Sequence, residues 1–140
     1  MKKKILLLLL LTGVLLSTNA QSEMEKINKT LFDYIEGTAN GEPKRLERAF
    51  HPDFNLYFVS RGTIRVWSGK EYVGNVKPGA KSNRIGKVIS IDYENDAAIA
   101  KIEIKMPARK RLYTDYLMLL KVNGAWKIIH KSFTYKNYPQ

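Results

Sequence analysis

The sequence predicts an α+β domain in which N-terminal helices pack against a cone-shaped, curved antiparallel sheet. Three observations support this fold class. Apolar residues recur at helical spacing early in the chain, strand-like alternation begins near residue 54, and an Asn-Gly dipeptide joins the last two apolar runs. The length of 140 residues fits one domain.

The first 20 residues, MKKKILLLLLLTGVLLSTNA, have the layout of a secretory signal peptide. A basic start is followed by an apolar stretch from Ile5 to Leu16 and by the small residue Ala20. A membrane anchor is the alternative, but a spanning helix needs about 20 apolar residues. We therefore expect a signal peptide at 1–20, a single domain at 21–140, a periplasmic or secreted location, and no stable membrane span.

The composition indicates which kinds of molecule the protein is expected to bind. The chain has 24 Lys and Arg against 13 Asp and Glu, and loss of Lys2 to Lys4 would leave 21 basic side chains and a net charge of +8. Excess positive charge favours anionic ligands or surfaces, whereas an exported protein is not expected to bind nucleic acid. The chain has no cysteine, so no disulfide supports the fold, which fits a bacterial periplasm. The basic cluster Arg109-Lys110-Arg111 follows Pro107 and predicts a solvated loop.

Two helices are expected first. Ser22 and Glu25 form a capping-box pattern, and a helix from about residue 23 to 39 follows, ending at Asn40-Gly41. Its apolar positions include Tyr34, which can point into the cone. Pro43 starts a short second helix that ends before Pro52, because a residue preceding proline avoids the helical region.

Strands are predicted for the rest of the chain, with one short helix among them. A hairpin of residues 54–59 and 63–67 precedes a helix at 70–76. An antiparallel meander follows, with strands at 84–93, 97–106, 112–122 and 126–135. A curved sheet of this kind, wrapped over a long helix, makes a cone with a pocket at its open end.

Several phrases of the chain resemble the nuclear transport factor 2-like superfamily, also called the cystatin-like roll. They are YIEGTANGEPKRLERAFHPDFNLYF (34–58), VWSGKEYV (66–73) and YTDYLMLLKVNGAWKIIHKSFTY (113–135). More narrowly, they look like the exported bacterial family named putative lumazine-binding. The resemblance covers nearly all of residues 21–140. It implies the cone fold and, as in many relatives, a dimer built on the sheet, but it does not imply an activity.

The superfamily also contains ketosteroid isomerase-like and SnoaL polyketide cyclase-like enzymes. The isomerase-like members carry a carboxylate base on the first strand. In this chain that strand, from Phe54 to Ser60, contains no Asp or Glu. This departure argues against the isomerase reaction and leaves only positions elsewhere in the pocket for a base.

The Asn123-Gly124 turn predicts which residues of the last hairpin share a face. A two-residue loop pairs Leu117 with His130 and Asp115 with Ser132. On this register the face toward the helix is apolar near the turn and polar away from it, as in a ligand pocket. Asp115 and His130 lie diagonally across the strand pair, within reach of each other.

Two roles are open for these polar residues. They can satisfy one another at the edge of a core, or His130 and Asp115 can act as an acid–base pair; the first is favoured because no nucleophile accompanies them. No metal and no cofactor is predicted. The candidate residues that line a pocket for a small organic ligand are Tyr34, Phe58, Trp67, Tyr113, Asp115, Leu117, Trp126, Ile128, His130 and Ser132.

The opposite face of the hairpin is too apolar for a purely solvated surface, and a patch of that kind marks an interaction site. We expect a homodimer through Leu112, Tyr116, Met118, Ile129 and Phe133. Three functions follow as hypotheses. The leading one is an exported, non-enzymatic ligand-binding or scaffold module, and the alternatives are a cyclase-like or isomerase-like enzyme and a protein-interaction module.

Overall fold

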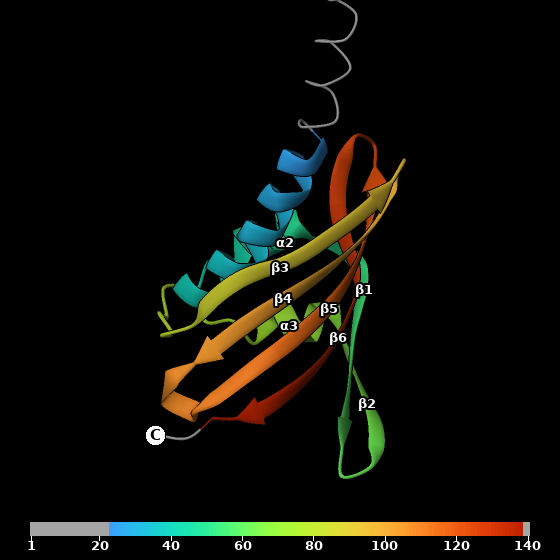
Figure 1. Ribbon diagram of the computed structural model, residues 1–140. Helices are drawn as coiled ribbons and strands as arrows, with labels where there is room; N and C mark the ends of the chain where they lie inside the picture. The colour runs from blue at the N-terminus through green and yellow to red at the C-terminus, as the bar shows by residue number, and fades with distance from the viewer. Residues whose placement is uncertain (1–22, 139–140) are drawn as a thin grey trace, which may run out of the picture.

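The computed structural model describes residues 23–138 of the chain and shows a six-stranded curved sheet with helices on its concave side (Figure 1). Helical residues 23–40 come first, and the sheet order is β2-β1-β6-β5-β4-β3. The elements are α2 (Pro43–Ala49), β1 (Phe50–Ser60), β2 (Thr63–Ser68), α3 (Gly69–Gly74), β3 (Ile85–Glu94), β4 (Ala97–Met106), a 3₁₀ turn (Pro107–Arg109), β5 (Arg111–Val122) and β6 (Ala125–Asn137).

The predicted α+β class and the order of elements are confirmed, with one correction to the sheet. Strands β3 to β6 form the expected antiparallel meander, but β1 pairs with β6 in parallel, so the sheet is mixed. β1 also begins earlier than predicted, at Phe50, which pairs with Ile128 before the register shifts ahead of Asn55. The signal peptide and the cap residue Ser22 lie outside the described residues.

The long first helix buries one face against the concave side of the sheet. Ile27, Leu31, Tyr34 and Ile35 recur at the spacing of one helix face and are almost fully buried, whereas Phe32 on the other face is half exposed. Alternate residues of the central strands meet this face, because side chains of a strand point to opposite sides in turn. The resulting core is continuous from the first helix to β6.

A charge cluster fastens the first helix to α2. The buried carboxylate of Asp33 accepts hydrogen bonds from Arg45 at 2.7 Å, from Lys29 at 3.3 Å and from Arg48 at 3.5 Å. Burial raises the pKa of Asp33, but the bonds from Arg45 and Lys29 outweigh it and leave the pKa below its usual value. This cluster fixes the rotation of the helix and therefore the side that Tyr34 faces.

The end of the first helix also fixes the loop that leads into β3. Gly41 has a φ of 65° and lies against the backbone of Lys77 and Ala80. The Gly41 carbonyl accepts from the Gly79 amide at 2.8 Å, and the Ala39 carbonyl accepts from the Ser82 amide at 2.7 Å. No helix within residues 23–138 is long and apolar enough to cross a membrane.

The β5–β6 hairpin begins as predicted and then departs from the predicted register. Asn123 and Gly124 have positive φ angles of 49° and 80°, and Val122 pairs with Ala125. Leu119 pairs with Ile128 as expected, but Met118 pairs with His130, which leaves Ile129 as an extra residue in β6. A β-bulge of this kind reverses the faces of all residues beyond it.

The predicted faces of residues 130–133 are therefore wrong. His130 and Ser132 pair with Met118 and Tyr116 on the outer side of the sheet, not on the core side. The residue that takes the inward position beside Leu117 is Lys131. Phe133, predicted on the outer dimer face, instead pairs with Asp115 and packs against the core.

Candidate functional site

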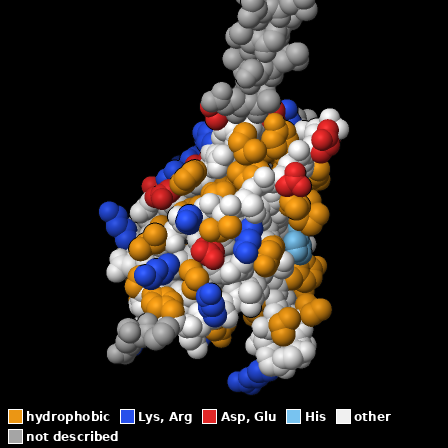
Figure 2. Space-filling model, viewed as in Figure 1, with side chains coloured by type: hydrophobic (Ala, Val, Ile, Leu, Met, Phe, Trp, Pro, Cys, Tyr) orange, Lys and Arg blue, Asp and Glu red, His pale blue; other side chains and the backbone are white. Residues whose placement is uncertain are grey.

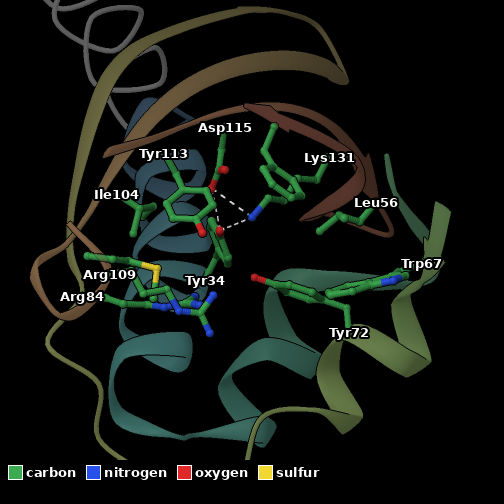
Figure 3. A pocket seen from close by; sticks show the side chains of 12 residues that line it. Tyr34, Leu56, Trp67, Tyr72, Arg84, Ile104, Arg109, Tyr113, Asp115 and Lys131 are labelled. Atoms are coloured by element: carbon green, nitrogen blue, oxygen red, sulfur yellow. Dashed lines mark hydrogen bonds and ion pairs between the residues drawn. The ribbon is translucent and has the colours of Figure 1, made fainter. Parts of the chain in front are cut away.

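A small cavity of about 130 Å³ lies between the concave face of the sheet, the first helix and α3 (Figure 3). The sheet provides most of its wall, the first helix and α3 each provide one tyrosine, and the loop before β3 and the 3₁₀ turn provide Arg84 and Arg109. The residues that line it are Tyr34, Leu56, Trp67, Tyr72, Arg84, Ile104, Met106, Arg109, Tyr113, Asp115, Lys131 and Phe133. We call this cavity the inner chamber.

Three polar side chains meet at one wall of the inner chamber, as the dashed lines of Figure 3 show. Lys131 Nζ lies 3.0 Å from Asp115 Oδ2, and the Tyr34 hydroxyl donates to the same oxygen at 2.6 Å. Lys131 also donates to the Tyr34 hydroxyl. The exposed fractions are 1% for Tyr34, 1% for Asp115 and 5% for Lys131, so the three groups satisfy one another without bulk water.

Each member of this triad comes from a different element. Tyr34 belongs to the first helix, Asp115 to β5 and Lys131 to β6. Aromatic rings surround the lysine amine, with the centroids of Tyr34, Tyr72 and Phe133 at 4.7, 5.2 and 5.6 Å from Nζ. These cation–π contacts add to the ion pair in holding a charged amine inside the domain.

Burial raises the pKa of Tyr34 well above its usual value, and the neighbouring Asp115 and Tyr72 raise it further. The Tyr34 hydroxyl therefore stays protonated at neutral pH and can donate a hydrogen bond. α3 brings Tyr72 to this position because Gly69, at its start, lies against Phe54 so closely that a Cβ there would come within 2.6 Å of that ring. A capping box between Ser68 and Glu71 starts the helix at that point.

The open side of the inner chamber is basic. Arg84 and Arg109 extend into it from the opposite side to Trp67 (Figure 3). Together with Lys131 they give three cationic groups against the single carboxylate of Asp115. Burial raises the pKa of Tyr113, but hydrogen bonds from Arg111 and Arg109 outweigh it and lower the pKa below its usual value.

A second, wider cavity of about 520 Å³ adjoins the first. The two share Trp67, Tyr72, Arg84, Met106 and Arg109, so the second cavity forms an outer vestibule to the inner chamber. The vestibule adds Lys77 to the basic side chains, and it has no acidic residue in its lining. The additional vestibule residues are Thr38, Asn75, Val76, Lys77, Ala80 and Ser82.

Of the ten residues predicted to line a ligand pocket, four line the inner chamber: Tyr34, Trp67, Tyr113 and Asp115. Leu117, Trp126 and Ile128 are buried core, and Phe58 packs between Trp67 and Phe133. His130 and Ser132 border a groove of about 380 Å³ on the outer face, together with Tyr116 and Met118. His130 and Asp115 therefore lie on opposite faces and are not an acid–base pair.

The most important residue that the sequence interpretation missed is Lys131. The sequence does carry one sign of its inward position. The two adjacent apolar residues Ile128 and Ile129 break the strict alternation of a strand, as a bulge does. Arg109 was assigned to a solvated loop; the 3₁₀ turn confirms the loop, but the side chain also lines both cavities. Within residues 23–138 no three His, Asp or Glu side chains come together in a way that would hold a metal ion.

The arrangement suits a small molecule that is apolar on its sides and negatively charged. The lining of the inner chamber is mostly aromatic and aliphatic, with the triad at one wall and two guanidinium groups at the opening. Arginine pairs with carboxylates and phosphates in a planar, two-pronged fashion. The triad offers an ammonium group, a phenol and a carboxylate, which are groups that bind polar atoms or transfer protons.

Comparison with known proteins shows to which family the chain belongs. The profile of the family described as "Putative lumazine-binding" matches residues 22–134. The chain belongs to this family. A relative from a Cladobotryum species, named aldolase FrzH, is 28% identical over 120 residues, which are 85% of this chain and 94% of the relative.

Solved structures support the nuclear transport factor 2-like fold of this family member. An NTF2-like protein from Silicibacter pomeroyi has a TM-score of 0.74 at 17% identity, over 84% of this chain and 98% of its own. One from Shewanella baltica has a TM-score of 0.72 at 22% identity, over 85% and 96%. Both are of unknown function. A cystatin-like fold protein from Burkholderia xenovorans has a TM-score of 0.61 at 16% identity, over 82% and 95%.

Proposed function

We propose that this protein is an exported module that binds a small anionic organic molecule in the inner chamber. The observation that carries the proposal is the buried triad of Tyr34, Asp115 and Lys131 at one wall of a cavity whose opening holds Arg84 and Arg109. A cavity with apolar walls and a few convergent polar groups is the usual form of a ligand site. The description of the family also names a small ligand, lumazine.

The size and charge of the inner chamber define the class of ligand. An apolar cavity of about 150 Å³ holds one benzene molecule, so this one, at about 130 Å³, fits a group of about six non-hydrogen atoms. Its lining carries three cationic side chains and one carboxylate. A small carboxylate fits, with its charge toward the arginines. A larger ligand would extend into the vestibule.

Isothermal titration calorimetry tests this function. The probes are acetate, benzoate, pyruvate and lumazine, with methylamine as a cationic control. Saturable binding of at least one of the anions, weakened by salt, is expected. Arg109→Gln should weaken it, whereas Arg61→Gln, in the β1–β2 turn and away from both cavities, should not. Absence of binding by every anion, or an equal effect of the two variants, would contradict the proposal.

The export part of the proposal rests on the signal-peptide pattern of residues 1–20. Expression of the full chain in a Gram-negative bacterium, followed by fractionation and N-terminal sequencing, tests it. The protein should be recovered from the periplasm or the medium with an N-terminus near Gln21. Full-length protein retained in the cytoplasm would contradict it.

Pairing of two copies through the outer face of the sheet also belongs to this proposal. Hydrophobic side chains on this face are exposed, including Ile99, Tyr116, Met118 and Leu120, and hydrophobic side chains lie beside a histidine on one flank in Figure 2. Lys101 and Asp92 lie next to these side chains. In a two-fold symmetric dimer each copy would therefore present one positive and one negative side chain to the other. Sedimentation velocity should show a dimer that Met118→Glu dissociates; a monomer at high concentration would contradict this.

An enzyme of the aldol type is a second candidate, favoured by the relative named aldolase FrzH and by the proton-transferring groups of the triad. Assay of carbon–carbon cleavage of small 4-hydroxy-2-oxo acids tests it, with Lys131→Arg as the variant that should lose activity. Activity that persists in Lys131→Arg would contradict this assignment of the site.

A further inference from the structure

Lys131 differs from the other described lysines in its surroundings. It is the one lysine with a buried side chain among residues 23–138. Its amine lies at the wall of a cavity rather than in packed core, so a molecule in the inner chamber can reach it. Burying an amine costs free energy even when it is paired, and hydrophobic residues would fill the same space without that cost. This position therefore favours a role for the amine itself.

The two partners of Lys131 are suited to moving protons to and from an amine. Asp115 Oδ2 lies 3.0 Å from Nζ and can accept a proton from the ammonium group. The Tyr34 hydroxyl also contacts Nζ and donates to the same carboxylate oxygen at 2.6 Å. A lysine amine is a nucleophile only after it has lost a proton, and both the base and a protonated phenol are within hydrogen-bond distance.

We propose that Lys131 adds reversibly to the carbonyl carbon of a small anionic aldehyde or 2-oxo acid and holds it as an imine. This inference rests on the proposed function, the binding of small anions in the same chamber. Arg84 and Arg109 supply the contacts for the carboxylate. Pyruvate has six non-hydrogen atoms, which is the number that fits the inner chamber at its volume of about 130 Å³.

The step balances within the site. The Lys131 ammonium gives one proton to Asp115, and the free amine forms a C–N bond as the carbonyl π electrons move to oxygen. That oxygen takes a proton from Tyr34, which recovers one from Asp115. A second proton from the nitrogen then reaches the hydroxyl through the same groups, water leaves, and the nitrogen lone pair closes the C=N bond. One ammonium and one carbonyl give one iminium ion and one water, so neither oxidant nor reductant is needed.

The iminium ion would keep the environment of the ammonium group that it replaces. Its positive charge remains beside Asp115, and the rings of Tyr72 and Phe133 stay next to the nitrogen, at 5.2 and 5.6 Å in the free amine. A largely apolar wall limits the access of water, which would hydrolyse the imine. The chamber therefore stabilises the adduct more than an exposed surface lysine does.

Reductive trapping of the wild-type protein tests the proposal. The protein is incubated with glyoxylate and sodium cyanoborohydride near neutral pH, digested, and examined by peptide mass spectrometry. A carboxymethyl group is expected on Lys131 well before it appears on Lys70 or Lys127, and acetate, which cannot form an imine, should slow the labelling by competition. Labelling that follows the surface exposure of the lysines, with Lys131 unmodified, would overturn the inference.

Two variants separate the covalent step from binding. Lys131→Arg keeps the cation next to Asp115 but cannot form an imine, so it should bind acetate in calorimetry and lose the specific label. Tyr34→Phe keeps the ring and removes the proton donor, so at saturating glyoxylate it should label about 10²-fold more slowly than the wild type; an unchanged rate would overturn the role of Tyr34. Acetate binding to the wild-type protein without trapping would refute the imine alone, whereas absence of binding would refute the proposed function as well.

Discussion

Lys131 Nζ and Asp115 Oδ2 lie 3.0 Å apart on neighbouring strands, and both side chains are almost fully buried. Such a pair contributes less to stability than its short distance implies, because two charges must leave water to form it. Removal of one partner, however, leaves the other charged and unpaired in the interior. This asymmetry makes the pair sensitive to single substitutions.

Asp115→Ala should therefore lower the free energy of unfolding by about 3–5 kcal/mol, while the double variant Asp115→Leu with Lys131→Met should recover much of that loss. Urea denaturation followed by circular dichroism measures both. A loss of stability in the double variant as large as the losses of Asp115→Leu and Lys131→Met added together would be the contrary result. It would mean that the two side chains do not depend on each other.

Deletion of Ile129 should remove the bulge without changing the faces of the residues beyond it, because His130 would still pair with Met118 and Lys131 with Leu117. Lys131 would keep its inward position beside Asp115, so the deletion variant should still fold. Ile129→Val keeps the bulge and should cost only about 1 kcal/mol. Thermal unfolding of the two variants compares them, and a deletion variant that fails to fold would be incompatible with Ile129 as the extra residue of a bulge.

Gly86→Ala should destabilise the contact between β3 and the first helix. A Cβ at residue 86 would lie 2.4 Å from Ile35 Cγ2 and 3.1 Å from Ile104 Cδ1, and overpacking of this kind costs about 1–3 kcal/mol. Gly74→Ala is the matched control, because a Cβ there meets nothing within 4 Å. Equal unfolding midpoints for the two variants would show that this close approach is absent.

Glu23 should contribute to stability only above acidic pH. Hydrogen bonds from Lys121, Lys26 and Trp126 lower its pKa from 4.5 to about 2. A carboxyl group whose pKa is lower in the folded state stabilises fully above the unfolded value and loses this contribution as pH falls through the folded value. Between about pH 4.5 and 2, Glu23→Gln should show a weaker loss of stability than the wild type.

Thermal melts across this range measure the effect, and Glu25→Gln provides a control on the exposed side of the same helix. Some pH dependence should persist in Glu23→Gln, because the pKa of Asp33 is lowered as well. Identical stability profiles for wild type and Glu23→Gln would rule out the ion pair between Glu23 and Lys121, which has a length of 2.9 Å.

Much of the fold was predictable because local signals agree with the global structure. The helical spacing that includes Tyr34, the Asn123-Gly124 turn and the alternation of the long strands each lead to the element observed. Trp126 and Ile128 could be placed in the core because the turn sets the register of the residues next to it.

The site was less predictable because one extra residue decides it. Up to Ile128 the register follows the turn; beyond Ile129 every side chain changes face. The hydrophobic pattern did not reveal this, since it makes Lys131 an outward residue and His130 a plausible inward one. Tertiary contacts with Asp115 and Tyr34 help to make an inward lysine stable, and these partners come from distant parts of the chain.

The contribution of Arg84 was hidden for a similar reason. It precedes β3 in a loop whose path depends on Gly41 and on the hydrogen bond from Ser82 to Ala39. The path of such a loop cannot be predicted from a local sequence pattern. The basic opening of the inner chamber is therefore a property of the assembled fold rather than of a motif.

Small anions are expected to bind in the inner chamber beside Lys131 and not on the outer face beside His130. Titration of ¹⁵N-labelled protein with pyruvate, followed by two-dimensional NMR, tests it most directly. Saturable shifts are expected for the amide signals of Leu56, Tyr113 and Lys131, whereas those of Met118 and His130 should stay nearly unchanged. Shifts confined to the outer face, or no saturable shift at all, would contradict it.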